Sequence, residues 1–560
     1  MKSFDPETIS IVDWKKINPS YKVHKSLNCP ECGKCVSQFC SGCHSVGYCS
    51  KEHQKNHWLQ GHKNECCAYK LVKKEGHGRI LIVTRDIEPG EVIFEESPIT
   101  VGPKQFCQPV CLGCYKNVNG TSICSGCNWP MCGNIECEKA PIHSKKECAL
   151  LADCHLKPII DLNKPEKDLP IYQFLTALRC LLVKEFRPDN WSILESMESH
   201  TELRKNEESY RVNQVNIVKF ILERIKYDTT VEDINKCIDV MDVNAFEIRS
   251  HEFSIAGLYP MTAMMNSNCS PNTQNSIDEN YICRVMAITR IPKGSEINST
   301  YTRTLSGTLY RRNQLKESKY FDCKCERCCD PTELNSHFST LLCQAILPSI
   351  SKTCKGFVYS ENSLNTNASW ICRACGAVMS HEEVTELTQK LEVEIEKEFL
   401  TIDDYENFLK NRLLKFLHPN HYIIVDFKFI LMKALSRAEY DPEIRIQREI
   451  RKKRIIEDIL DVHSLITPGY FRIRAMLVSE RCMVMMSIAF HNLSNSNKNE
   501  IFLEECERII DGLEECVSIL RFENTNSVEG QRYKACVNYI EKLKNIIEMR
   551  KNKTMIPASS

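Results

Sequence analysis

Cysteine and histidine recur at the spacing of metal ligands in two blocks, and this pattern constrains the fold more than any other feature of the sequence. Each Cys-x2-Cys turn offers two of the four nitrogen or sulfur ligands that zinc takes in a tetrahedral site. Eight ligands in a block therefore indicate two zinc ions in each block. The first block consists of Cys29, Cys32, Cys40, Cys43, Cys49, His53, His62 and Cys66, and the second of Cys111, Cys114, Cys124, Cys127, Cys132, Cys137, His143 and Cys148.

Composition excludes several classes of protein. The residues after Met1 lack the apolar region of a secretory signal, and no run of about 18 apolar residues is present to span a membrane. We therefore expect the 33 cysteines to lie in a reducing compartment, the cytoplasm and nucleus, and to bind metal rather than form disulfides. Because 73 basic residues balance 73 acidic ones, we expect no direct DNA binding. We also expect a monomer.

Residues 266–301 are the second strong constraint. Residues 266–272 are polar and rich in turn-forming types, and residues 281–288 alternate apolar with polar side chains. Residues 291–301 contain a Lys-Gly turn before a β-prone segment that ends in Tyr301. The pattern predicts a loop, a strand, a turn and a second strand. A polar loop before an ordinary hairpin is the structural alternative.

This stretch closely resembles the signature of SET-domain protein-lysine methyltransferases. The resemblance implies that the loop at Asn266 holds S-adenosylmethionine and that Tyr301, the catalytic residue, lines the lysine channel. The family motif Asn-His-Ser-Cys reads Asn266-Ser267-Asn268-Cys269 here. The resemblance extends to a Gly-x-Gly turn within residues 69–102 and to an Asn-x-Phe pair at 244–246. The cofactor-binding residues that it implies are Gly76, His77, Gly78, Asn244, Asn266, Ser267, Tyr301 and Phe321.

The first cysteine block resembles a MYND finger, because Gln54 and Trp58 stand between its last ligands. In that family the zinc sites are cross-braced. The resemblance implies two sites in the first block, Cys29, Cys32, Cys49 and His53, and Cys40, Cys43, His62 and Cys66. It implies two more in the second block, Cys111, Cys114, Cys132 and Cys137, and Cys124, Cys127, His143 and Cys148. MYND fingers bind peptides, often proline-rich ones, and the second finger lacks the Gln-x3-Trp element.

A finger inserted early in a SET domain is typical of the SET and MYND domain (Smyd) family, and the tandem arrangement resembles its arthropod members. The segment after Tyr301 resembles the post-SET segment of that family. There Cys323, Cys325 and Cys328 take Cys269 as the fourth ligand of one zinc. This ligand set brings the expected total to about five zinc ions. Whether Cys343, Cys354, Cys372 and Cys375 form another site stays open, because only Cys372-x2-Cys375 is a good half-site.

Apolar residues at helical spacing predict helices in two regions. In residues 149–240 they include Leu178, Val215 and Ile221, and from residue 380 onward they include Val384 and Phe502. The fold class is therefore α+β and multidomain, with a β-rich SET core and a C-terminal helical domain similar to tetratricopeptide arrays. The expected domains are an N-terminal extension 1–28, MYND finger 29–66, SET N-terminal part 67–110, inserted MYND-like finger 111–148, helical SET insertion 149–240, SET core 241–305, post-SET zinc segment 306–333, linker with a candidate cysteine site 334–379, and tetratricopeptide-like helical domain 380–550.

Two functions are compatible with these features. The first is S-adenosylmethionine-dependent methylation of histone or non-histone lysines, with partners bound by the MYND finger. The second is a non-catalytic adaptor or transcriptional repressor built from the same modules. Retention of Asn266, Asn272, Tyr301 and Phe321 favours the first, and the Ser267-Asn268 replacement favours the second. The basic stretch 445–454 is read as a solvated helix face, with an acidic-peptide or nucleic-acid contact as the alternative.

Overall fold

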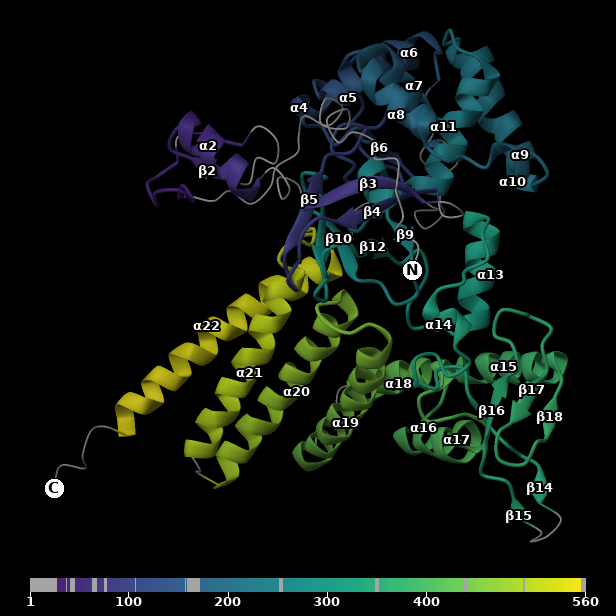
Figure 1. Ribbon diagram of the computed structural model, residues 1–560, viewed down its shortest axis with the longest axis vertical. Coiled ribbons are helices and arrows are strands. Elements are labelled where there is room, and N and C mark those ends of the chain that lie inside the picture. Colours follow the sequence, from purple (N-terminus) through teal and green to yellow (C-terminus); the bar gives the residue numbers. More distant parts are fainter. Residues whose placement is uncertain are drawn as a thin grey trace. The chain divides into compact units, whose positions relative to one another are not determined.

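The computed structural model describes residues 28–36, 38–40, 46–62, 68–74, 78–105, 107–156, 158, 172–250, 255–347, 352–437, 439, 441–496 and 499–554. The chain divides into two compact units. Figure 1 labels their helices and strands. Unit 1 comprises Met1–Asn266, Asn275–Ile297 and Phe522–Gln531. Unit 2 comprises Ser267–Gln274, Asn298–Arg521 and Arg532–Ser560. Among the described helices, none has the length and apolar character that a membrane span requires.

Short antiparallel sheets form the core, and β11 (Cys283–Ala287) and β12 (Glu296–Ser299) lie in the segments 281–288 and 291–301 that were predicted to form strands. The sheet β3-β4-β12-β9 contains β3 (Tyr69–Lys74), β4 (Gly78–Val83), β12 (Glu296–Ser299) and β9 (Asn266–Ser267). A second sheet orders β10 (Thr273–Ile277), β11 (Cys283–Ala287) and β5 (Val92–Glu96), and a third orders β6 (Thr100–Pro103), β8 (Ile255–Leu258) and β7 (Phe246–Ile248). Alternating side chains such as Leu81, Phe94 and Val285 are buried between them, as period-2 patterning requires.

Helices follow in unit 1, and the first of them, α7 (Leu175–Phe186), packs on β6 of the third sheet. They are α7 (Leu175–Phe186), α8 (Pro188–Ser196), α9 (Thr201–Arg204), α10 (Glu208–Asn213), two π-helical segments (Gln214–Val218 and Phe220–Ile225) and α11 (Val231–Asn244). A side chain at Gly102 of β6 would collide with Thr176 of α7, so glycine permits this close packing. Leu178 and Ile221 are buried as predicted, whereas Val215 is 58% exposed, because the π-helical turns shift the buried face.

The two fingers contain little regular structure. The first has β1 (Gln38–Phe39), β2 (Gly47–Tyr48) and α2 (Lys51–His57), followed by a π-helical turn (Trp58–His62). Ser50 begins α2 as its N-cap, with its hydroxyl accepting from the His53 amide at 3.2 Å. The second has α4 (Ile135–Glu138), α5 (Pro141–Ser144) and α6 (Glu147–Asp153). Such small modules bury few apolar side chains, so metal is expected to hold them folded.

Unit 2 begins with α13 (Thr308–Lys319) and α14 (Glu326–Cys329) and continues into small sheets. Residues 334–379, expected to be a linker, contain the sheet β13-β16-β17-β18, formed by Leu341–Leu342, Phe357–Ser360, Trp370–Cys372 and Val378–Met379. A separate pair is formed by β14 (Ile346–Leu347) and β15 (Lys352–Thr353). This segment therefore contains regular structure, but its strands are only two to four residues long, too short for an alternating pattern to predict them.

The rest of unit 2 is helical, as predicted. The helices are α15 (His381–Ile395), α16 (Ile402–Phe408), a π-helical turn (Leu409–Leu413), α17 (Leu414–Phe416), α18 (Tyr422–Leu435), α19 (Pro442–Ile466), α20 (Arg472–Ser496), α21 (Asn499–Leu520) and α22 (Val528–Thr554). Helices α19, α20 and α21 pack in succession (Figure 1). Val384 and Phe502 lie in one large apolar core of this helical part. Together with the antiparallel sheets, it confirms the α+β multidomain class.

Candidate functional site

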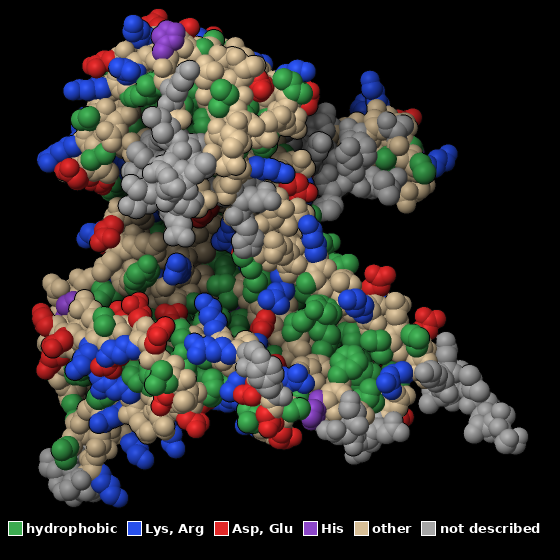
Figure 2. All heavy atoms as spheres, turned by 180° about the vertical axis from the view of Figure 1, so that it is seen from behind, with side chains coloured by type: hydrophobic (Ala, Val, Ile, Leu, Met, Phe, Trp, Pro, Cys, Tyr) green, Lys and Arg blue, Asp and Glu red, His purple; other side chains and the backbone are tan. Residues whose placement is uncertain are grey.

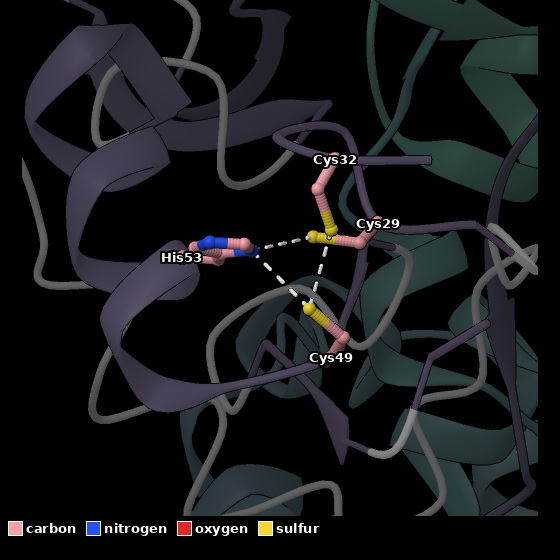
Figure 3. Close-up of side chains that lie close together, drawn as sticks. All are labelled: Cys29, Cys32, Cys49 and His53. Atoms are coloured by element: carbon pink, nitrogen blue, oxygen red, sulfur yellow. Dashed lines mark hydrogen bonds between the residues drawn. The ribbon is translucent and has the colours of Figure 1, made fainter. Parts of the chain in front are cut away.

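The first finger brings together one set of zinc-type ligands. Cys29, Cys32, Cys49 and His53 converge with their ligand atoms within 4.8 Å of one another (Figure 3). The Cys32 and Cys49 sulfurs are 3.4 Å apart, and His53 Nδ1 lies 3.2 Å from the Cys49 sulfur. A zinc ion with Zn–S bonds of about 2.3 Å would separate two tetrahedral sulfurs by roughly 3.8 Å. The spacing therefore suits one ion, and α2 places His53 one turn after Cys49.

The other predicted set of this finger is only partly described. Cys40 and His62 are buried, whereas Cys43 and Cys66 lie outside the described residues. The His62 ring stacks on His57 at 5.1 Å between centroids. His57 belongs to neither predicted ligand set, and its Nδ1 lies 2.9 Å from the Tyr48 hydroxyl. It therefore packs beside the ligands and not among them.

The second finger shows both of its predicted sets. One comprises Cys111, Cys114, Cys132 and Cys137, and the other Cys124, Cys127, His143 and Cys148. The Cys132 and Cys137 sulfurs are 3.5 Å apart, and the Cys124 and Cys148 sulfurs are 3.6 Å apart. These are tetrahedral-edge distances, far beyond the roughly 2.0 Å of a disulfide. The cross-braced grouping is therefore present here without the Gln-x3-Trp element.

A buried polar chain supports the histidine of the second finger. His143 Nδ1 lies 2.9 Å from a Glu147 oxygen, and Arg179 donates to Glu147 at 2.6 and 2.9 Å. Burial opposes ionisation of Glu147, but the Arg179 guanidinium outweighs it and lowers the pKa of Glu147. A carboxylate at Nδ1 fixes the tautomer that presents Nε2 to a metal. Glu147 and Arg179 were not predicted as functional residues, although the His-x3-Glu spacing is a usable signal for Glu147.

The post-SET cysteines meet a ligand from the 266–272 loop. Cys269, Cys323, Cys325 and Cys328 form one group, with the Cys269 sulfur 3.5 Å from that of Cys328. Segments separated by more than fifty positions thus complete one coordination set. The Cys269 side chain is fully buried. A zinc here would tie the loop that follows Asn266 to the post-SET segment.

Two buried arginines offset part of the negative charge of this group. Arg311 lies 3.6 Å from the Cys328 sulfur, and Arg327 donates to the Cys269 carbonyl at 3.1 Å. Glu333 receives hydrogen bonds from both guanidinium groups. Burial opposes ionisation of Glu333, but the two arginines outweigh it and lower its pKa to about 2. Because four thiolates exceed the charge of one zinc ion, this cationic support favours the thiolate form. The charge-offsetting role of these arginines depends on contacts in space and was not predicted from the sequence.

Ser267 contacts the predicted catalytic residue. Its hydroxyl accepts from the Tyr301 backbone amide at 3.3 Å. Tyr301 and Phe321 pack against the cluster of Cys269, Leu315 and Cys323. Burial raises the pKa of Tyr301 to about 12, so its phenol is neutral at physiological pH. The serine that replaces the family histidine therefore positions the backbone of Tyr301.

Asparagines hold the loop beside Tyr301. The backbone N–H of Asn272 donates to the side-chain oxygen of Asn298 at 2.9 Å. In return, the backbone N–H of Asn298 donates to the side-chain oxygen of Asn272, also at 2.9 Å. The Asn268 amide donates to the Ser299 carbonyl at 2.7 Å. This reciprocal pairing pins residues 268–272 to the strand that leads into Tyr301. Asn298 was not identified from the sequence, since its role appears only through pairing in space.

Asn266 is held in unit 1. Its side-chain amide donates to Glu296 at 2.8 Å, which leaves the carbonyl oxygen as an acceptor suited to an ammonium group. Met261 and Thr262 shortly precede Asn266 in the chain. Their backbone N–H groups donate to the buried Glu96 carboxylate at 2.7 and 2.8 Å. Burial raises the pKa of Glu96 to about 7. Glu96 thus holds the chain that leads into the Asn266 motif, a role that the sequence did not reveal.

The remaining predicted cofactor residues differ in their surroundings. Gly76 and His77 lie outside the described residues. Gly78 has φ +72°, and apart from its chain neighbours no atom of the described residues lies within 4 Å of the point where a side chain would begin, so a ligand could approach its backbone. Asn244 uses its side-chain amide on two carbonyls, those of Glu198 at 2.7 Å and Val240 at 2.9 Å. The side-chain N–H groups of Asn244 are therefore used at the C-terminal end of α11. A role of Asn244 in cofactor binding remains a prediction.

A further group of four cysteines does not belong to any of the five ligand sets that were predicted. It consists of Cys343, Cys354, Cys372 and Cys375. The sequence left this group open, and the structure brings its four sulfurs within 4.8 Å of one another.

Comparisons with known proteins identify two modules. The MYND finger model matches residues 29–66, and the SET domain model matches residues 78–302. SET domain-containing protein SmydA-8, isoform B, of Drosophila melanogaster is 27% identical over 384 residues, which cover 65% of this chain and 81% of that protein. Histone-lysine N-methyltransferase ASHR1 of Arabidopsis thaliana is 28% identical over 333 residues, 57% of this chain and 66% of that protein. N-lysine methyltransferase SMYD2 of Gallus gallus is 25% identical over 264 residues, 45% of this chain and 58% of that protein.

Proposed function

We propose that this chain, which belongs to the SET and MYND domain protein family, is an S-adenosylmethionine-dependent protein-lysine N-methyltransferase. The observation that carries the proposal is the hydrogen bond between Ser267 and the Tyr301 amide, beside the paired loops at Asn272 and Asn298. Position 267 is where this sequence departs from the family motif. The contact supports an intact catalytic loop, because the serine hydroxyl holds the backbone that presents the phenol.

Methyl transfer to lysine is an in-line displacement that depends on alignment and exclusion of water. The bound cofactor would supply a sulfonium methyl group. Asn266 would bind its amino-acid end through the side-chain oxygen, and Gly78 would let it approach the backbone. Tyr301, neutral with a pKa of about 12, would hydrogen-bond the target amine and orient its lone pair. Phe321 would form part of the apolar wall that keeps water from the amine.

A titration of the full chain with S-adenosylmethionine by calorimetry tests the proposal directly. Saturable binding, together with transfer of a labelled methyl group to lysine in a peptide or histone panel, is the expected result. Absence of cofactor binding by a folded, zinc-loaded chain would favour the adaptor or repressor function instead. Ser267→Ala separates the two roles of the loop. It should lower turnover more than cofactor affinity, because it removes the acceptor for the Tyr301 amide.

The chain also contains a MYND finger, a module suited to protein partners, and we propose that it binds proline-rich peptides. Trp58 is 38% and Leu59 74% exposed, which supports an apolar contact beside Gln54. Trp58→Ala in the full chain should abolish capture of a proline-rich peptide while retaining zinc. Retained capture would place peptide recognition elsewhere.

We further propose that the chain is a monomer of cytoplasm and nucleus that does not bind DNA directly. Basic and acidic side chains intermingle on the face shown in Figure 2. The basic stretch 445–454 of α19 supports this interpretation, since four of its six cations form ion pairs with acidic side chains. The ion pairs are Arg448–Glu439, Arg451–Glu406, Lys452–Glu480 and Lys453–Glu457. Binding of a DNA duplex that weakens steeply with salt would contradict the proposal.

A further inference from the structure

The four sulfurs of Cys343, Cys354, Cys372 and Cys375 have the geometry of a metal site. The Cys343 and Cys375 sulfurs are 3.6 Å apart, and the Cys354 and Cys372 sulfurs are 3.8 Å apart. All four lie within 4.8 Å of one another. Tetrahedral zinc with bonds of about 2.3 Å requires sulfur separations of roughly 3.8 Å. Two disulfides would require separations of roughly 2.0 Å within each pair.

Backbone amides point at three of these sulfurs. The amides of Ala345, Gly356 and Ala374 lie 3.5, 3.3 and 3.4 Å from the sulfurs of Cys343, Cys354 and Cys372 respectively. Each amide is two residues beyond its cysteine. A thiol is a weak acceptor, whereas a thiolate is a strong one, so this repeated contact favours metal-bound thiolates.

Glycines make the turns that bring the sulfurs together. A side chain at Gly356 would meet the Cys372 sulfur at 2.6 Å and the Cys354 sulfur at 3.3 Å. Gly376 follows Cys375 with φ +75°, a conformation that suits glycine. The Cys343 amide donates to the Gly356 carbonyl at 2.9 Å, and the Cys354 amide to the Ala345 carbonyl at 2.7 Å. The two cysteine turns are therefore locked face to face.

We propose that these cysteines bind one structural Zn²⁺ and make a zinc ribbon of residues 341–347 and 352–379. Four soft thiolate ligands in a tetrahedral arrangement favour zinc, and mononuclear iron is the competing metal. The ribbon is joined to the helices of unit 2 through the Leu341–Leu417 bridge and a 2.7 Å hydrogen bond from Gln344 to the Lys415 carbonyl. Three of its cysteines lie in the same core as Leu391 and Leu417. The metal thus fixes a sheet against the helical domain, independently of the methyl-transfer chemistry.

Elemental analysis of the full chain tests the site. The C372S/C375S double variant should contain one zinc ion fewer per chain than the wild type. Cys375→His should keep the ion, because imidazole also binds zinc and Cys375 is not fully buried. Cys154→Ser is the matched control, since Cys154 belongs to none of the five ligand groups and its sulfur donates to the Leu151 carbonyl as a hydroxyl could. Equal zinc in wild type and double variant, or iron in place of zinc, would overturn the proposal.

Differential alkylation of the wild type gives a second readout that needs no variant. With zinc present, Cys343, Cys354, Cys372 and Cys375 should resist an alkylating reagent. After a chelator they should become reactive together, and mass spectrometry of the peptides would identify them. Rapid alkylation of any of the four in the zinc-loaded chain, or disulfides among them in the unreduced protein, would overturn the assignment.

Discussion

At the scale of single residues, Ser267 changes how the motif is understood. A serine in place of histidine weakens the resemblance when only the sequence is considered. In the structure its hydroxyl accepts from the Tyr301 amide, so the position retains a structural role for the catalytic loop. A polar side chain that is short enough to reach a neighbouring amide can serve here without an imidazole.

Tyr301→Phe should lower kcat by about 100-fold or more while cofactor affinity changes little. The reason is that the phenol acts on the amine in the transition state. Turnover with a methyl-accepting peptide and calorimetric titration of the cofactor measure the two effects separately. Tyr310→Phe is the matched control, because Tyr310 is 53% exposed on α13. Undiminished turnover in Tyr301→Phe would remove the phenol from the mechanism.

Glu96 should make the stability of unit 1 depend on pH. Its pKa is raised by burial from 4.5 to about 7, so folding favours the protonated form. Stability from this group is therefore greatest below pH 4.5 and is lost as pH rises through about 7, by at most about 3 kcal/mol. Thermal melts of wild type and Glu96→Gln at pH 5 and pH 8 measure the effect. The stability of the variant relative to the wild type should be higher at pH 8 than at pH 5. A difference that does not change with pH would contradict this assignment.

At the scale of elements, small modules are held by what surrounds their metal ligands. Helix α6 begins with Glu147, and α7 presents Arg179 to it. The second finger is thereby fixed to the helical insertion through a buried ion pair. A finger of few apolar residues obtains its orientation from this chain of contacts.

Glu147→Gln should weaken zinc binding at the Cys124, Cys127, His143 and Cys148 set by about 10- to 100-fold. The amide cannot hold the His143 tautomer as a carboxylate does, and it leaves the Arg179 charge buried without its partner. Competition with a chromophoric chelator measures the labile ion. Glu136→Gln, at an exposed position of the same finger, should behave as the wild type. Equal zinc affinity in both variants would make the ion pair irrelevant to the metal.

At the scale of the molecule, zinc joins segments that are far apart in sequence. The expectation of about five ions counted two for each finger and one for the post-SET segment. The described residues contain five ligand groups, but one of them is the ribbon. The second set of the first finger, with Cys43 and Cys66 outside the described residues, would bring the total to six.

Cys269→Ser should remove one zinc per chain and release the post-SET cysteines to alkylation. Cofactor binding should also weaken, because the 266–272 loop loses its anchor to residues 323–328. Elemental analysis, peptide mapping and cofactor titration report these three effects. Cys329→Ser, at an exposed cysteine beside the same group, is the control. Unchanged zinc content in Cys269→Ser would refute the shared site.

The sequence by itself determined the modules and most of the metal-ligand sets. Cys-x2-Cys spacing, the alternation in residues 281–288 and the helical period after residue 380 are local patterns, and local geometry dictates what each can form. The spacing of Cys323, Cys325 and Cys328 likewise required a fourth ligand, and the family pattern assigned it to Cys269.

Tertiary structure decided the features that depend on distant partners. Arg179 meets Glu147, Asn298 meets Asn272, and Glu96 meets the Thr262 amide only after the chain has folded. The ribbon is the clearest case, since Cys343 and Cys354 have no recognisable spacing and become a site only when two glycine-dependent turns face each other. Coordination depends on distances in space, and sequence spacing reports those distances only within a single turn.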